Sequence, residues 1–205
     1  MAPASPFYQK VPEWEINPMV SAWAKEHDVG FPEELKNGKV KDLTAKVNMI
    51  FKFSPRHVFR SYHTHLFMGH QKVATAYTLY RYEQCLGVPL WIHIDGSHNP
   101  RPVVRNFARR RVREGIRAAL AERGYTFEGR VADAGETGTG GAQDAPKKDL
   151  KGTVFLYVKN PVTVFNQSRE KHIQVGREIV SWVESRQSTG QSAPQLPRRP
   201  QNRRY

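Results

Sequence analysis

The stretch that most restricts how this chain can fold runs from Arg101 to Arg130 and holds nine arginines against three glutamates. Within it, apolar residues recur at intervals of three and four, the spacing that places side chains on one stripe of an α-helix. The members of this stripe are Val103, Val104, Phe107, Val112, Ile116, Ala119 and Leu120, with Arg123 at its end. The sequence therefore predicts a helix with one side in a core and one cationic side.

The arginines of this helix are the main candidates for a binding site. They are Arg101, Arg105, Arg109, Arg110, Arg111, Arg113 and Arg117. A guanidinium group donates two parallel hydrogen bonds to a phosphate and keeps its charge at any physiological pH. A solvated helix face is the usual alternative, but such faces intersperse acids, and only Glu114 and Glu122 could form i,i+4 pairs here. We therefore predict that the helix binds a polyanion, with nucleic acid as the first candidate.

The formal net charge of +13 is concentrated in two blocks. Residues 47–130 carry fourteen basic and five acidic side chains, and residues 186–205 carry five basic side chains and no acid. Four arginines of the second block, Arg198, Arg199, Arg203 and Arg204, lie in a segment with almost no apolar residues. Such a segment should be disordered alone and gain order against folded RNA, although a merely solubilising tail has the same composition.

The hydrophobic pattern predicts an α/β fold. Residues 47–53, 89–95 and 151–158 have the pattern of strands, and residues 125–131 are a weaker candidate. Residues 56–86 place Phe59, Tyr62, Leu66, Val73, Tyr77 and Tyr80 on one face of a long helix, broken at Gly69. A strand, a helix and a second strand imply a crossover that leaves the first two strands parallel. Residues 159–165 indicate a hairpin or a kinked extension, and a last helix, capped by Asn166 or Ser168, should run to about Arg186.

We expect a single compact domain with a small mixed sheet and two or three packed helices, an extended N-terminal arm and a basic C-terminal tail. Residues 1–46 are the proline- and aromatic-rich arm, with a short helix near Pro18–His27 and with Trp14 and Trp23 packed on this domain or on a neighbour. Residues 47–186 are the α/β RNA-binding domain, with a mobile, acidic, glycine-rich loop at 132–150. Residues 187–205 are the disordered, arginine-rich tail.

Three other kinds of site have weaker support in the sequence. His93, Asp95 and His98 lie at the end of a predicted strand and could serve acid–base or phosphoryl chemistry, but a turn before Pro100 explains them as well. The histidines of segment 57–70 could bind a metal, but no carboxylate accompanies them. Tyr62, Tyr77, Tyr80 and Tyr82 could stack on bases, but aromatic residues at helical spacing usually belong to a core. We therefore predict no catalytic residue, metal, cofactor or small-molecule substrate.

Together these patterns favour a structural RNA-binding component of a large ribonucleoprotein. A mitochondrial ribosomal protein is the leading hypothesis, with ribosomal RNA bound by the arginine-rich helix and the C-terminal tail, and with neighbouring ribosomal proteins bound by the N-terminal arm. The alternatives are an enzyme that acts on phosphorylated or nucleic-acid substrates through His93, Asp95 and His98, and a basic accessory subunit of a protein complex.

The expected compartment follows from the single cysteine and from what the N-terminus lacks. Cys85 excludes an internal disulfide, which favours a reducing interior. The chain has no run of about 20 apolar residues that would span a membrane. We expect the mitochondrial matrix, reached without an evident cleavable presequence, or otherwise the cytosol or the nucleus.

Overall fold

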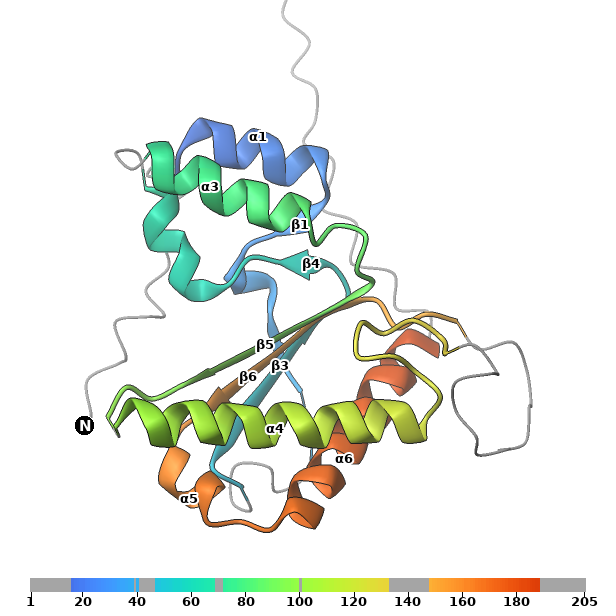
Figure 1. The fold of residues 1–205 in the computed structure, drawn as a ribbon. Coiled ribbons are helices and arrows are strands. Elements are labelled where there is room, and N and C mark those ends of the chain that lie inside the picture. The colour runs from blue at the N-terminus through green and yellow to red at the C-terminus, as the bar shows by residue number, and fades with distance from the viewer. Residues whose placement is uncertain are drawn as a thin grey trace, which may run out of the picture.

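A computed structural model describes residues 16–38, 40, 47–68, 72–99, 101–132 and 148–188. These residues form a mixed α/β fold in which helices pack on both faces of a small sheet (Figure 1). The predicted fold class, a single compact α/β domain with a small mixed sheet, is confirmed.

The central sheet has four strands in the order β2-β3-β6-β5. Their bounds are Lys36–Asn37 for β2, Met49–Ser54 for β3, Leu90–Gly96 for β5 and Gly152–Val158 for β6. Strand β3 is antiparallel to both of its neighbours, β2 and β6, whereas β5 pairs with β6 in parallel. The strands predicted at 47–53, 89–95 and 151–158 correspond to β3, β5 and β6.

The order of the strands shows that the predicted crossover was wrong. Strand β6 lies between β3 and β5 and is antiparallel to β3, so the first two predicted strands are neither neighbours nor parallel. The crossover instead joins β5 to β6 through α4 (Pro102–Glu122). The chain between β3 and β5 leaves the sheet and builds a separate layer, which a pattern of local periodicity could not reveal.

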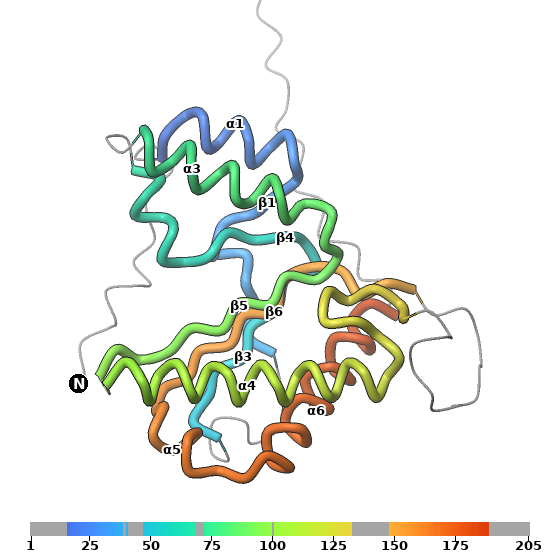
Figure 2. Tube along the Cα trace, in the orientation of Figure 1, coloured from blue at the N-terminus to red at the C-terminus, as the bar shows by residue number. Residues whose placement is uncertain are grey.

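Helix α4 occupies the range that the sequence predicts and packs on one face of the sheet. Its buried residues are Ala108, Val112, Gly115, Ile116, Ala119 and Leu120. Val103 is 77% exposed, so the apolar stripe reaches the core only from Ala108 onward. The same face carries α5 (Pro161–Phe165) and α6 (Arg169–Ser188), which lies against α4 (Figure 2).

Helices α4 and α6 touch backbone to backbone where two glycines meet. A Cβ atom built on Gly115 would lie 2.5 Å from the carbonyl oxygen of His172. A Cβ atom on Gly176 would lie 2.5 Å from the carbonyl oxygen of Gly115. Any side chain at either position would therefore force the two helices apart. Helix α4, which carries the arginines, would be displaced from α6.

Replacing Gly115 by alanine should lower the free energy of unfolding by about 2–3 kcal/mol, because the new methyl group overpacks a backbone contact. Helix propensity alone would change it in the opposite direction, by about 1 kcal/mol. Gly87→Ala, in the turn after α3, is the control for a glycine with free space, since nothing lies within 4 Å of its Cβ position. Chemical denaturation of both variants tests this; a stabilised Gly115→Ala protein would mean that the helices do not meet at this residue.

A second layer covers the other face of the sheet. It consists of α1 (Pro18–Glu26), β1 (Val29–Gly30), η3 (Pro32–Glu34), β4 (His57–Val58), η4 (Ser61–Phe67) and α3 (Lys72–Glu83). Strands β1 and β4 pair in parallel. Trp91 points into this layer, whereas Leu90 and Ile94 of the same strand point toward α4 and α6. The two cores therefore lie on opposite sides of β5.

The helix predicted near Pro18–His27 is present as α1. Trp23 lies in the second core, with its ring centroid 5.8 Å from that of Phe59 and 6.5 Å from that of Tyr82. Residues 16–38 of the predicted arm are thus part of the fold, whereas Trp14 lies outside the described residues.

The long helix predicted for residues 56–86, with a break at Gly69, is present only in its second half, as α3, whereas its first half is not α-helical. The chain there forms β4, η4 and α3 in turn, and Gly69 lies outside the described residues. The hydroxyl of Tyr82 holds the start of η4 against α3. It accepts a hydrogen bond from the backbone N–H of Arg60 at 2.8 Å and lies 2.7 Å from Nδ1 of His63. These contacts join residues that are about twenty positions apart.

Three shorter predictions have separate outcomes. Residues 125–131 form an isolated bridge between Tyr125 and Val131 instead of a strand. Residues 159–165 form neither a hairpin nor an extension: the side chain of Asn160 accepts hydrogen bonds from the N–H groups of Val162 and Thr163 and begins α5. Ser168 caps α6, since its Oγ accepts a hydrogen bond from the N–H of Lys171 at 3.3 Å.

Candidate nucleic-acid interface

Five arginines follow one another along α4 at a spacing of four residues. They are Arg101, Arg105, Arg109, Arg113 and Arg117, and we call them the arginine ridge. Four residues advance an α-helix by about 6 Å and turn it about 40° past one revolution, so successive members of the row are neighbours while the row winds by about 160° around the helix from Arg101 to Arg117. The spacing is visible in the sequence, but the sequence prediction treated the arginines as a diffuse arc.

No carboxylate pairs with the ridge among the described residues, because the acids nearby have other partners. Glu114 pairs with Arg110 at 2.9 Å, which is not a ridge residue. Glu122 accepts two hydrogen bonds from Arg177 of α6, at 2.6 and 2.8 Å, and these bonds lower the pKa of the Glu122 carboxyl. Thus Glu114 forms the predicted i,i+4 pair, and Glu122 does not.

Among the residues that the structure describes, the ridge residues have neutral partners or none. Arg105 donates from Nη1 to Nδ1 of His98 at 2.9 Å, and the guanidinium of Arg117 lies 5.1 Å from the ring centroid of Phe127. Arg101 and Arg113 are exposed, and Nε of Arg109 has no hydrogen-bond partner in the described part of the chain. Arg111 is distinct from the ridge because it does not fall on the four-residue spacing, and its guanidinium lies 4.8 Å from the ring centroid of Phe107.

The ridge does not stabilise the helix that carries it. Like charges four residues apart destabilise a helix by about 0.2–0.5 kcal/mol per pair. Arg101 and Arg105 also stand at the N-terminal end, where the helix dipole disfavours positive charge. The first turn has no acid, and the N-cap residue Arg101 makes no side-chain cap. Selection for stability alone would not place charge in this way, so the ridge requires another explanation.

The three residues considered for catalysis do not form one site. His93 points into the second layer, where its Nε2 lies 3.3 Å from the carbonyl oxygen of Val58. Asp95 lies on the same face, 3.7 Å from Nη2 of Arg60. His98 is exposed beyond the end of β5 and accepts the hydrogen bond from Arg105. By its contacts, His98 belongs with the arginine ridge.

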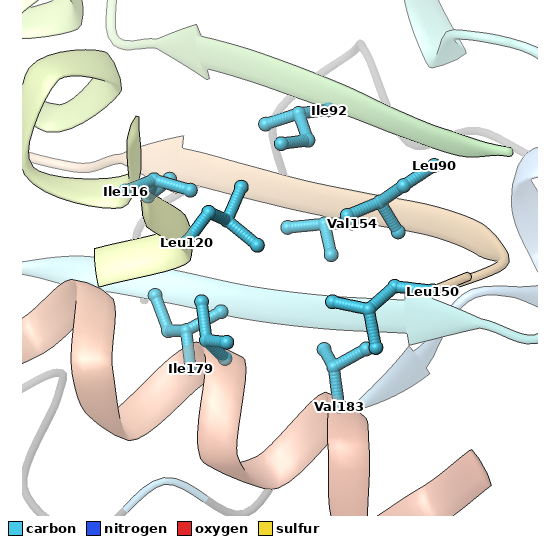
Figure 3. Close-up of a pocket in the computed structure, with 9 residues that line it drawn as sticks. Leu90, Ile92, Ile116, Leu120, Leu150, Val154, Ile179 and Val183 are labelled. Atoms are coloured by element: carbon cyan, nitrogen blue, oxygen red, sulfur yellow. The ribbon is translucent and has the colours of Figure 1, made fainter. Parts of the chain in front are cut away.

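Burial and the nearby Arg60 lower the pKa of His93 to about 3. An imidazole of this kind is neutral at physiological pH and is a poor general base, since an effective base has a pKa near the working pH. The cavity between α4, α6 and the sheet is also unsuited to a substrate, because aliphatic side chains such as Leu90, Leu120 and Val183 line it (Figure 3). None of the described side chains that line it carries a polar group that could orient a ligand.

Two of the histidines considered as metal ligands contact other groups of the protein. Nε2 of His57 lies 3.2 Å from the carbonyl oxygen of Pro89, and His63 contacts the hydroxyl of Tyr82. Within the described ranges, no three His, Cys, Asp or Glu side chains are grouped so that they could hold a metal ion. His70 lies outside these ranges.

Two further predicted elements lie largely or wholly outside the described residues. These are the loop at 132–150, apart from its ends, and the tail with Arg198, Arg199, Arg203 and Arg204. None of the helices in the described ranges is both long enough and apolar enough to cross a bilayer.

Comparison with known proteins gives no relative for this chain: no family model, curated protein or solved structure matches it. The function must therefore be inferred from the chemistry of the surface.

Proposed function

We propose that this protein is a structural RNA-binding component of a large ribonucleoprotein. The observation that carries the proposal is the arginine ridge, a row of five guanidinium groups with no carboxylate partner in the described part of the chain. A row of fixed positive charges complements a row of phosphates, and each contact adds affinity by releasing a counterion. The packing of α4 on α6 fixes the backbone from which the row projects, so the helix itself needs no ordering when RNA binds.

Within that class we propose a mitochondrial ribosomal protein that contacts ribosomal RNA through α4 and the C-terminal tail. The composition supports this narrower proposal: net positive charge is concentrated in two blocks, and Cys85 is the only cysteine. Proteins built into an RNA particle need this combination of a compact centre and basic extensions. The proposed setting is the mitochondrial matrix, with neighbouring ribosomal proteins on the N-terminal segment.

Purification of the tagged full-length chain from its own cells tests the proposal. We expect RNA and many ribosomal proteins to copurify, and nuclease treatment to release the tagged chain. Deletion of residues 190–205 should reduce incorporation into the particle while the melting temperature of the free protein stays unchanged.

Two results would contradict the proposal. A nuclease-resistant complex of proteins alone would indicate an accessory subunit, and recovery of the chain alone with an activity that depends on Asp95 would indicate an enzyme. If the chain without residues 190–205 is incorporated normally, the tail is not part of the RNA interface, and the proposal is restricted to α4.

A further inference from the structure

Helix α3 exposes the side chains that its sequence suggests should be buried. Val73, Tyr77 and Tyr80 are 85%, 63% and 58% exposed. Their spacing of four and three residues places them on one stripe of the helix. The buried stripe lies on the opposite side and consists of Thr75, Thr78, Leu79 and Tyr82. The helix is therefore turned so that its tyrosine-rich stripe faces away from the protein.

The contacts of the buried stripe fix this orientation. The hydroxyl of Thr75 donates to the carbonyl oxygen of Leu66, and that of Thr78 donates to the carbonyl oxygen of Ala74 at 2.7 Å. The hydroxyl of Tyr82 accepts the N–H of Arg60. A rotation of α3 that buried Tyr77 would break the bonds of Thr75 and Tyr82 and leave buried polar groups unpaired. The exposed stripe is thus a stable feature of the fold.

The stripe has the chemistry of a surface that binds unpaired bases. The rings of Tyr77 and Tyr80 contact no other ring in the described part of the chain. Lys72 and Arg81 lie in the same helix and are exposed, and the one acid of α3 is its last residue, Glu83, which is also exposed. Exposed aromatic rings between cations bind single-stranded nucleic acid, because bases stack on the rings while phosphates meet the charges.

We propose that α3 is a second RNA site, where unpaired bases of a single strand stack on Tyr77 and Tyr80 and where Lys72 and Arg81 contact the adjacent phosphates. This inference rests on the proposed RNA-binding function. It adds that the RNA includes an unpaired segment and that it reaches the face of the sheet opposite α4 (Figure 1). The two surfaces are therefore separate and respond to different substitutions.

The probe for this site is an oligoadenylate of about eight nucleotides, a length within the range of one single-strand site. Binding to the purified full-length chain is measured by fluorescence anisotropy at several salt concentrations. Replacing Tyr77 and Tyr80 together by leucine should weaken binding about tenfold or more, because stacking on both rings is lost. The salt dependence of binding should not change, since no charge is removed. The Tyr77→Phe, Tyr80→Phe protein keeps both rings and should bind like the wild type.

Each other result contradicts a defined part of the argument. If the leucine variant binds the oligoadenylate like the wild type, the stacking site is wrong and the proposed function stands on α4 alone. If the phenylalanine variant is as weak as the leucine variant, the hydroxyl groups and not the rings are responsible, and stacking is again wrong. If the wild type binds neither the oligoadenylate nor a structured RNA hairpin, the proposed function itself fails. Both pairs of substitutions are at exposed positions, so an unchanged melting temperature is the check on folding.

Discussion

The free energy of unfolding should fall as the pH is lowered from about 6.5 toward 4, because burial keeps several histidines neutral in the folded protein. Desolvation lowers the pKa of His57, His63, His93 and His172, to about 4 for His63 and about 3 for His93. Between these values and the ordinary value of 6.5, the unfolded chain binds more protons than the folded one. Stability therefore rises with pH in this window and is lost as the pH falls through it.

His93 is the residue through which this effect can be measured. Each pH unit between the two pKa values of one buried group changes the free energy of unfolding by about 1.4 kcal/mol. His93→Gln removes the titrating group and retains an N–H that can donate to the carbonyl oxygen of Val58. Below pH 6.5, the slope of its free energy of unfolding against pH should therefore be smaller by about 1.4 kcal/mol per pH unit. Denaturant titrations from pH 4 to pH 8 give both profiles. Above pH 6.5 the two curves should run parallel, and equal slopes below it would show that His93 is accessible to protons in the folded state.

The sequence predicts the elements of this fold better than it predicts their arrangement. The helix at α4 and the strands β3, β5 and β6 have clear periodic patterns, and the structure has them within a few residues of the predicted bounds. The position of β6 between β3 and β5 depends on contacts between segments more than 50 residues apart. Hydrophobic periodicity contains no information on such pairing.

Helix α3 shows why the wrong side of a helix can be assigned to the core. Periodicity finds a stripe of large apolar residues, but it cannot distinguish a stripe that packs inside from one that is free to bind a partner. Here Thr75 and Thr78 can be buried because their hydroxyl groups bind nearby carbonyl oxygens. The large residues Tyr77 and Tyr80 are then left outside.

The arginine ridge was only partly predictable. The choice of α4 as the candidate interface follows from the sequence, as does the spacing of its arginines. The sequence does not show which arginines are neutralised by a carboxylate. Glu122 binds Arg177 and Glu184 binds Arg123, and each of these pairs joins α4 or its end to α6. Only the packed structure separates the ridge from the paired arginines around it.

Replacing Arg109, Arg113 and Arg117 together by glutamine should weaken RNA binding about a thousandfold or more at low salt, since each charged hydrogen bond to a phosphate contributes about 1.5–3 kcal/mol. The slope of log affinity against log salt should fall by about 2 to 3, or roughly 0.7–0.9 for each lost contact. Folding should be unaffected or slightly improved, because like charges are removed from neighbouring turns. Binding of a structured RNA hairpin over a range of salt concentrations measures the slope.

The matched control removes the same charge from outside the ridge. Arg110, Arg130 and Arg177 are exposed, and each pairs with a glutamate, at 2.9, 3.7 and 2.6 Å. If the ridge is the binding surface, Arg110→Gln, Arg130→Gln and Arg177→Gln together should change the slope far less than the ridge substitutions do, because their charges are already compensated in the free protein. Equal losses from the two triple variants would show that RNA responds to the net charge of the protein and not to an ordered row of arginines. The ridge would then be only the densest part of a diffuse positive field.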